Sequence, residues 1–185
     1  SGPYLIDALK KDFEFAIEQR PDYLGLSFVS KDADVLSVKA ILRDHNAEIP
    51  IISKIERGQA IKNFDRILSV SDGIMVARGD LGVEVDFNRV PMIQKDIVEK
   101  CIKASTPVII ATQMMESMMN NFRPTRAEAT DVANAVLDGA DTLMLSGETS
   151  VGKYPDLVIN SMQKIVDWTE EHGFKYFRGS SPTEM

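Results

Sequence analysis

Short β-rich runs alternate with longer amphipathic stretches along the whole of this 185-residue chain. The β-rich runs are residues 23–29, 50–56, 73–80, 107–113 and 142–148. Apolar residues recur at helical spacing over residues 5–19, 32–45, 58–70, 90–105, 126–138 and 155–172. Each of these stretches is long enough for a crossover between two parallel strands. The pattern therefore predicts an α/β fold of about five βα units around a parallel sheet.

No linker-like composition divides the chain, so a single domain is expected over residues 1–172, followed by an irregular tail over residues 173–185. The clearest helix start is at Thr125, because Thr125 and Glu128 have the spacing of a capping box, and Gly139 can end that helix. A complete (β/α)₈ barrel takes about 250 residues, and a doubly wound sheet of five strands takes fewer than this chain has. Both architectures place their chemistry beyond the carboxyl ends of the strands.

Polar side chains follow apolar ones at the ends of four runs. Because alternate residues of a strand share a face, each run defines one set. The sets are Ile52, Lys54 and Glu56; Val76, Arg78 and Asp80; Ile110 and Thr112; and Met144, Ser146 and Glu148. The repeated order predicts a face that starts in a packed interior and opens into a polar mouth.

Lys54 and Glu56 are charged residues carried by an otherwise apolar strand, so each must pair or hold a ligand. One interpretation is a simple ion pair between the two. The other adds Asp80, at the end of the next run, as a second carboxylate for an octahedral Mg²⁺. A divalent metal beside a fixed ammonium stabilises the developing negative charge of an enolate or a transferring phosphoryl group.

Three further residues at the strand ends could contact a ligand. Gly79 and Gly82 allow close approach to the backbone, although each could equally be a turn glycine. Thr112 offers a hydroxyl that could bind a carboxylate, relay a proton or cap a turn.

Segment 147–153 (GETSVGK) imitates a glycine-rich phosphate loop between a strand and a helix. The phosphate loop requires Ser or Thr after its Lys, and Tyr154 stands there instead. A nucleotide-binding module built on this loop remains an alternative reading.

Charge and composition exclude several classes of protein. With 21 Lys and Arg against 28 Asp and Glu, the formal charge of −7 argues against a nucleic-acid-binding surface. Apolar runs are too short for a membrane-spanning helix. The single cysteine, Cys101, lies among apolar residues and is expected to be a packed thiol, in keeping with a cytoplasmic protein. The chain starts without Met or a signal-peptide pattern, so we expect it to lie inside a longer protein.

Six motifs in order resemble those of one family. They are IISKIE (51–56), DGIMVARGDLG (72–82), ATQM (111–114), RPTRAE (123–128), DVANAV (131–136) and MLSGET (144–149). On these motifs the chain resembles the second half of the catalytic barrel of the pyruvate kinases. The resemblance implies a partial TIM (β/α)₈ barrel carrying strands four to eight.

The resemblance also implies phosphoryl transfer from phosphoenolpyruvate to ADP, giving pyruvate and ATP, with Mg²⁺ (or Mn²⁺) and K⁺. Lys54 would stabilise charge on the phosphoryl group and the enolate, and Glu56 and Asp80 would be the metal ligands. The residues implied around the substrate are Ala77, Gly79, Asp80 and Thr112. Ser146 and Glu148 would lie near a proton relay to the enolate carbon.

The family's K⁺ site, its phosphate-clamping arginine and much of its ADP site correspond to segments that this sequence does not contain. We therefore expect the chain to be inactive alone. An incomplete barrel also exposes two strand edges, so we expect the chain to self-associate. The resemblance implies a homo-oligomer, a tetramer for the parent enzyme. Two alternatives stay open beside the nucleotide-binding module. One is a Mg²⁺-dependent aldolase or lyase acting on a pyruvate enolate, and the other is a non-catalytic interaction domain.

Overall fold

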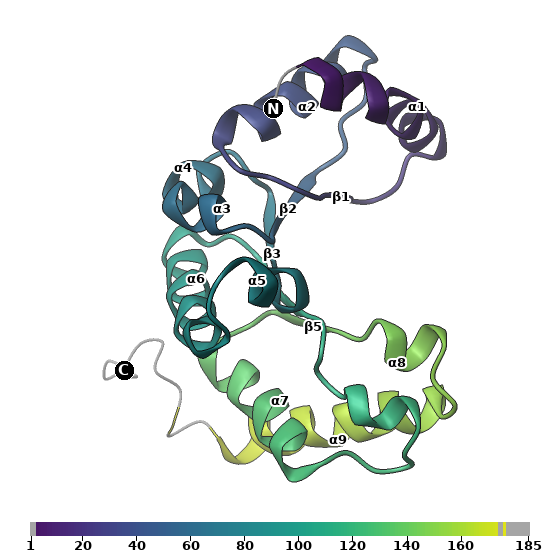
Figure 1. Ribbon diagram of the computed structural model, residues 1–185, viewed down its shortest axis with the longest axis vertical. Helices are drawn as coiled ribbons and strands as arrows, with labels where there is room; N and C mark the ends of the chain where they lie inside the picture. Colours follow the sequence, from purple (N-terminus) through teal and green to yellow (C-terminus); the bar gives the residue numbers. More distant parts are fainter. Residues whose placement is uncertain (1–2, 174–175, 177–185) are drawn as a thin grey trace.

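A computed structural model describes residues 3–173 and 176, which form a curved parallel sheet covered by helices (Figure 1). The strands are β1 (Leu24–Leu26), β2 (Ile51–Ile55), β3 (Gly73–Ala77), β4 (Val108–Ala111) and β5 (Thr142–Met144). Every strand pairs in parallel with the one that precedes it along the chain, so the spatial order is β1-β2-β3-β4-β5. A crossover helix between successive neighbours is the arrangement of a (β/α) barrel.

Helices α2, α4, α6, α7 and α9 lie outside the arc of the sheet in Figure 1 and pack side by side in that order. The α-helices are α1 (Pro3–Gln19), α2 (Asp32–Asp44), α3 (Gly58–Lys62), α4 (Phe64–Leu68), α5 (Arg78–Glu84), α6 (Val90–Ala104), α7 (Arg126–Asp138), α8 (Gly147–Ser150) and α9 (Pro155–His172). Two 3₁₀ turns are η1 (Phe87–Arg89) and η2 (Glu116–Met119). The short helices α5 and α8 directly follow strands β3 and β5.

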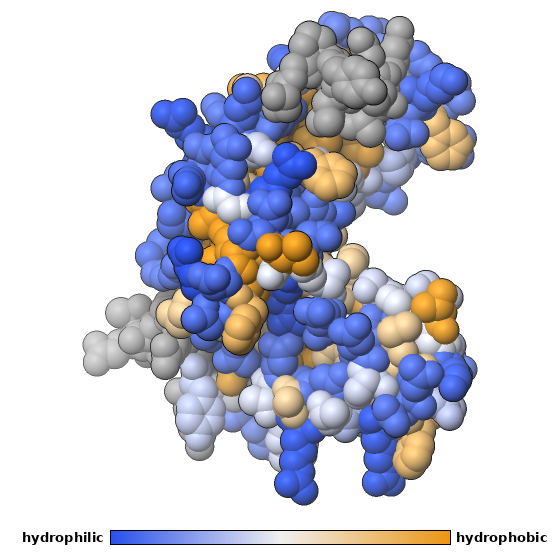
Figure 2. Space-filling model, viewed as in Figure 1, coloured by the Kyte–Doolittle hydropathy of each residue, from blue (hydrophilic) through white to orange (hydrophobic). Residues whose placement is uncertain are grey.

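Strand register divides the sheet into an outer face against the helices and an inner face on the concave side. Ile55, Val76 and Ile110 lie side by side on the outer face and are fully buried. Lys54, Met75 and Ile109 form the neighbouring row on the inner face. The inside of the arc is open in the space-filling view (Figure 2), so the core lies between the sheet and its helices.

This register corrects the predicted common face. Val76 and Ile110 lie on the helix-facing side, opposite to Lys54, so their sets do not continue the face of Lys54 and Glu56. Moreover, β3 ends at Ala77 and Asp80 belongs to helix α5. Alternation along one run cannot show which face a neighbouring run shares, because that depends on register.

Most predicted elements are confirmed. All predicted helices are present, except that stretch 58–70 forms two short helices, α3 and α4, which meet at Asn63. The five predicted strands are present but shorter than their runs. Thr112 lies beyond the end of β4, Ser146 lies beyond the end of β5, and Glu148 lies on helix α8, so the expected strand positions of these residues are wrong. The capping box of Thr125 and Glu128 and the left-handed Gly139 at the end of α7 are also present. The predicted tail over residues 173–185 lies, apart from 173 and 176, outside the described residues.

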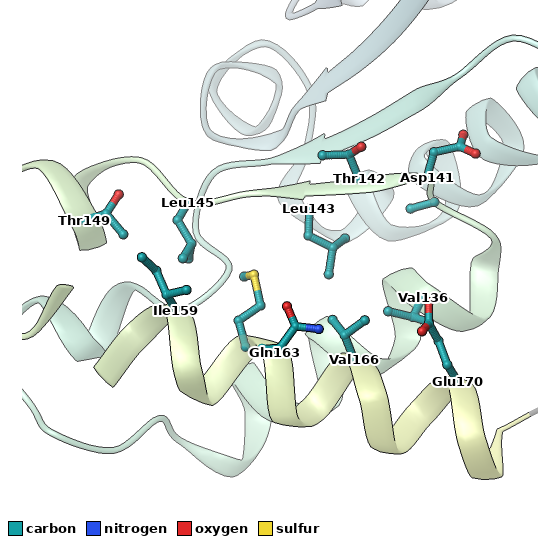
Figure 3. A pocket seen from close by; sticks show the side chains of 12 residues that line it. Val136, Asp141, Thr142, Leu143, Leu145, Thr149, Ile159, Gln163, Val166 and Glu170 are labelled. Atoms are coloured by element: carbon teal, nitrogen blue, oxygen red, sulfur yellow. The ribbon is translucent and has the colours of Figure 1, made fainter. Parts of the chain in front are cut away.

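Cover over the sheet is thinnest at β5. A groove of about 530 Å³ separates β5 from α9, and Leu143 and Leu145 face Ile159 and Val166 across it (Figure 3).

Among the described residues, β1 and β5 are the edge strands. The described helices include none with the length and apolar character needed to span a membrane.

Two aspartates tie neighbouring strands together at the amino end of the sheet. Asp72, just before β3, accepts a hydrogen bond from the Ile51 N–H at the start of β2 at 2.8 Å. Asp141, just before β5, does the same for the Val108 N–H of β4 at 2.8 Å. Asp22 lies two residues before β1, and the described part of the chain has no strand before β1 for it to contact. We call this hydrogen bond the aspartate latch. A strand can be fixed by it only if a strand that precedes it in the sequence lies beside it in the sheet.

Replacing Asp72 by Asn should lower the free energy of unfolding at neutral pH by about 1 kcal/mol, because the bond to a charged acceptor is weakened. Burial alone would raise the pKa of Asp72. The hydrogen bond from the Ile51 N–H and the nearby Lys39 ammonium together lower it by more than burial raises it, so the pKa of Asp72 lies below its ordinary value. The latch therefore stabilises the fold above the unfolded pKa of about 4, and its contribution is lost as pH falls through the lower folded value.

Urea unfolding at several pH values measures this effect. The difference between wild type and Asp72→Asn should shrink as the solution is acidified. Asp22→Asn is the matched control and should change stability little at any pH. An equal effect of the two substitutions would contradict the latch.

Candidate functional site

The predicted lysine and glutamate meet at the carboxyl end of β2. Lys54 Nζ lies 2.7 Å from Glu56 Oε1, and the two side chains are 27% and 4% exposed. Lys54 Nζ also donates to Ser27 Oγ at 2.9 Å, while Glu56 Oε2 accepts the Phe28 N–H at 2.9 Å. The ion-pair interpretation is therefore correct for this structure, and the pair is also held by the loop after β1.

Asp80 lies in the first turn of α5, beyond the end of the adjacent strand. Its side chain is exposed and makes no hydrogen bond or ion pair with the described part of the chain. Glu56 and Asp80 thus follow the same ends of two neighbouring parallel strands, as predicted. Within residues 3–173 and 176, no cluster of three or more His, Cys, Asp or Glu side chains is placed to hold a metal ion. The described residues therefore offer at most two such side chains to one metal ion.

The space beside Glu56 is bordered by small residues. The strand register pairs Ala77 with Ala111 at the ends of β3 and β4, and both are buried. Glu56 is itself only 3% exposed, whereas the Lys54 side chain beside it is 27% exposed.

Thr112 and Gly79 are in direct contact. The Gly79 N–H donates to Thr112 Oγ1 at 2.8 Å, and a Cβ added at Gly79 would lie 3.3 Å from that oxygen. Thr112 and Gln113 both have left-handed backbones, with φ of 70° and 55°. Two consecutive non-glycine residues in this region are uncommon, and such strain tends to gather at functional sites.

Glu148 is buried on α8 and is fully hydrogen-bonded. Its Oε1 accepts the Met115 N–H at 3.1 Å, and its Oε2 accepts the Ser146 N–H at 2.9 Å and the Ser146 hydroxyl at 3.4 Å. Burial raises the pKa of Glu148, but the N–H groups of Glu148, Ser146 and Met115 outweigh it and keep the pKa below its usual value. Glu148 is therefore an ionised carboxylate that joins the loops after β4 and β5.

The resemblance of segment 147–153 to a phosphate loop has another explanation in the structure. A Cβ added at Gly152 would lie 2.2 Å from the Glu148 carbonyl oxygen, and the Lys153 N–H donates to the Met119 carbonyl at 2.9 Å. Gly152 is required by close packing, and nothing in this geometry favours a nucleotide-binding module.

Two observations concern residues outside the polar mouth. Burial, followed by the nearby Asp141 charge, raises the pKa of Cys101 to about 12, so this thiol is packed and unreactive, as predicted. Met114, Met115 and Met118 are fully buried and belong to the hydrophobic core.

Sequence reasoning assigned no role to Ser27, Phe28 or Arg78. Ser27 and Phe28 hold Lys54 and Glu56, and Arg78 binds the carbonyl oxygens of the Thr112 turn. Their partners lie 27 to 34 residues away along the chain, so local spacing carries no signal for them.

The comparisons with known proteins agree on one family. Residues 3–159 match the family model described as the pyruvate kinase barrel domain. A pyruvate kinase of Bacillus licheniformis is 50% identical over 170 residues, which is 91% of this chain and 29% of that protein. One of Dictyostelium discoideum is 56% identical over 154 residues, 83% of this chain and 30% of that protein. One of Thermococcus litoralis is 52% identical over 165 residues, 88% of this chain and 35% of that protein. The chain thus spans about a third of the length of these relatives.

Glu148→Gln should destabilise the fold by about 2 kcal/mol, because an amide turns a donor toward N–H groups that need an acceptor. Since the folded pKa of Glu148 is lowered, the wild-type advantage is present above the unfolded pKa of about 4 and is lost as pH falls through the folded value. Chemical denaturation at neutral and acidic pH measures it. Glu116→Gln, an exposed change on η2, is the control and should be nearly neutral. Equal stability of the two variants at neutral pH would show that the hydrogen bonds of Glu148 to the loops after β4 and β5 do not stabilise the fold.

Proposed function

This chain belongs to the pyruvate kinase family, and we propose that it forms the metal- and enolate-binding part of a site that transfers a phosphoryl group from phosphoenolpyruvate to ADP. The observation that carries the proposal is the group at the carboxyl ends of β2 and β3. There an ammonium and a buried carboxylate lie in contact, and an exposed carboxylate lies in the first turn of α5, just after the neighbouring strand. Family membership adds the substrate.

The donor set suits Mg²⁺ or Mn²⁺. Mg²⁺ in phosphoryl-transfer sites is bound through one or two carboxylates and takes its other oxygen ligands from water and substrate phosphate. Glu56 and Asp80 provide this number, and the described residues provide no larger cluster. When bound, the ion would supply Lewis-acid stabilisation of the enolate and phosphoryl oxygens. K⁺, in this proposal, is held by residues outside this chain.

Lys54 would act on the charge that develops during transfer. Its ammonium is held by Glu56 and Ser27 and is partly exposed, so it can contact an anion without first leaving a buried position. A fixed positive charge stabilises the negative charge on a leaving enolate and a loose phosphoryl group. Backbone at Ala77, Gly79 and Asp80 and the hydroxyl of Thr112 would hold the substrate beside it.

Ser146 and Glu148 would serve the protonation of the enolate carbon. The lowered pKa of Glu148 makes its carboxylate a poor proton donor. We therefore assign Glu148 to the orientation of Ser146, whose hydroxyl and N–H both lie against the carboxylate. Ser146 would take part in the proton relay through its hydroxyl.

The remaining parts of the proposal concern assembly and location. The edge strands β1 and β5 present unpaired backbone groups among the described residues, and such edges favour association. We propose a homo-oligomer, tetrameric in the whole protein, working in the cytoplasm. Neither a lyase reaction nor a purely structural role is favoured by any contact in the site.

Mn²⁺ binding tests the metal site. The chain should bind Mn²⁺ measurably by electron paramagnetic resonance, and Glu56→Gln or Asp80→Asn should weaken binding by about tenfold or more, because each removes one of two charged oxygen ligands. Asp86→Asn, an exposed acid shortly after α5, is the control and should leave affinity unchanged. Equal effects of all three substitutions would indicate general charge attraction and refute the site.

Turnover tests the division of the active site. The 185-residue chain alone should show essentially no pyruvate formation from phosphoenolpyruvate and ADP in an assay coupled to lactate dehydrogenase. In the full-length protein, Lys54→Met should lower kcat by about a hundredfold or more, because transition-state charge loses its partner. Substantial turnover by the isolated chain, or normal kcat in that variant, would contradict the proposal. Light scattering of the isolated chain should report self-association.

A further inference from the structure

The turn after β4 is held in a conformation that its residues do not favour. Thr112 and Gln113 both have φ between 50° and 75°, directly after the last strand residue, Ala111. A side chain with a Cβ is disfavoured in this region, and the cost recurs at each residue. Gln113 is exposed and has no side-chain hydrogen bond with the described residues that could compensate. Some other group must stabilise this backbone.

The Arg78 guanidinium makes the contacts that can do so. Its Nη2 donates to the Thr112 carbonyl at 2.8 Å and to the Gln113 carbonyl at 3.1 Å, and its Nε donates to the Thr112 carbonyl at 3.2 Å. The Arg78 side chain is only 10% exposed, so its two bonds to the Thr112 carbonyl are partly shielded from water.

A carboxylate on the helix layer fixes the guanidinium from the other side. Arg78 Nη1 lies 2.9 Å from Asp131 Oδ1 and 2.7 Å from Oδ2. A partly buried charge of this kind requires a partner, and Asp131 provides it from α7. The planar guanidinium can therefore bind the turn and the helix at the same time, which a lysine ammonium cannot do with the same geometry.

The residue after Arg78 contacts the same turn. The Gly79 N–H donates to the Thr112 hydroxyl at 2.8 Å. Thr112 is therefore held at two atoms: Arg78 donates to its carbonyl oxygen, and the Gly79 N–H donates to its hydroxyl oxygen. The position of this hydroxyl relative to the start of α5 depends on both contacts.

We propose that Arg78 is a positioning residue: it holds the left-handed turn at Thr112 and Gln113, so that the Thr112 hydroxyl faces the Gly79 backbone, and Asp131 orients its guanidinium. The importance of Arg78 for catalysis rests on the proposed function, which assigns Thr112 and Gly79 to the substrate. The role of Arg78 in holding the turn is independent of the proposed function.

Hydrogen exchange of the Gly79 amide, followed by nuclear magnetic resonance, measures this effect directly. In Arg78→Met the Gly79 amide should exchange about tenfold faster or more, because its acceptor is no longer held in place. The amides of Val76 and Ile110, in the strands, should keep their protection. Lys95→Met is the control: Lys95 pairs with Asp138 and Asn134 between the neighbouring helices and does not contact the turn. It should leave Gly79 unchanged.

Relief of the backbone strain provides an independent test. Glycine adopts positive φ without steric cost, so Gln113→Gly added to Arg78→Met should restore part of the Gly79 protection. If Arg78→Met does not fold, Arg78→Lys replaces it and should show a smaller acceleration, also reduced by Gln113→Gly. Unchanged exchange at Gly79 in a folded Arg78 variant would overturn the proposal. Acceleration spread equally over Val76 and Ile110 would also overturn it, because it would show general destabilisation.

A titration with Mg²⁺ and phosphoenolpyruvate separates this proposal from the proposed function. Wild-type chain should show shifts at Gly79 and Thr112, and Arg78→Met should need about tenfold more phosphoenolpyruvate. No shifts in wild type would refute the assigned substrate contacts while leaving the exchange result to decide the role of Arg78. Equal titration of wild type and Arg78→Met would refute its contribution to binding.

Discussion

Charged side chains that bond the backbone of the neighbouring βα unit are the interaction on which this sheet depends. Asp72 and Asp141 bind strand N–H groups at the amino end. Glu56 and Glu148 bind loop N–H groups at the carboxyl end. The chain connects two parallel strands through a long crossover rather than a tight turn. The ends of neighbouring parallel strands are therefore held together by additional hydrogen bonds. Hydrogen bonds to ionised groups are among the stronger ones available for this purpose.

At the carboxyl end the same bonds shape the candidate site. Glu56 is pinned by Phe28, a residue with a left-handed backbone, and its second oxygen faces Lys54. In the proposed site, Glu56 would be a metal ligand while its Oε1 stays beside the Lys54 ammonium, which is partly exposed and can face an incoming anion. The ion pair is the observed arrangement, and under the proposed function the same residues would also hold the metal ion. The left-handed backbone of Phe28 has a local energetic cost, and such strained residues gather at functional sites, where geometry matters more than local stability.

The sequence determined the elements well because helices and parallel strands leave strong periodic patterns. The boundaries of α7 follow from Thr125, Glu128 and Gly139 alone. Face and partner could not be predicted in the same way. Asp80 was expected on a strand but lies on α5, since a strand and the first turn of a helix look alike over three residues. Arg78 looked like one more polar residue, because Asp131 and Thr112, which give it its role, lie far away along the chain.

The order of the strands also bears on how the chain reaches this structure. Because each strand pairs with its immediate predecessor, every sheet contact closes a loop only one βα unit long. The entropic cost of closing such a loop grows only slowly with its length, although parallel pairing is intrinsically slow to form. The sheet can therefore grow by successive addition during synthesis, each new unit docking on a surface that the ribosome has already released.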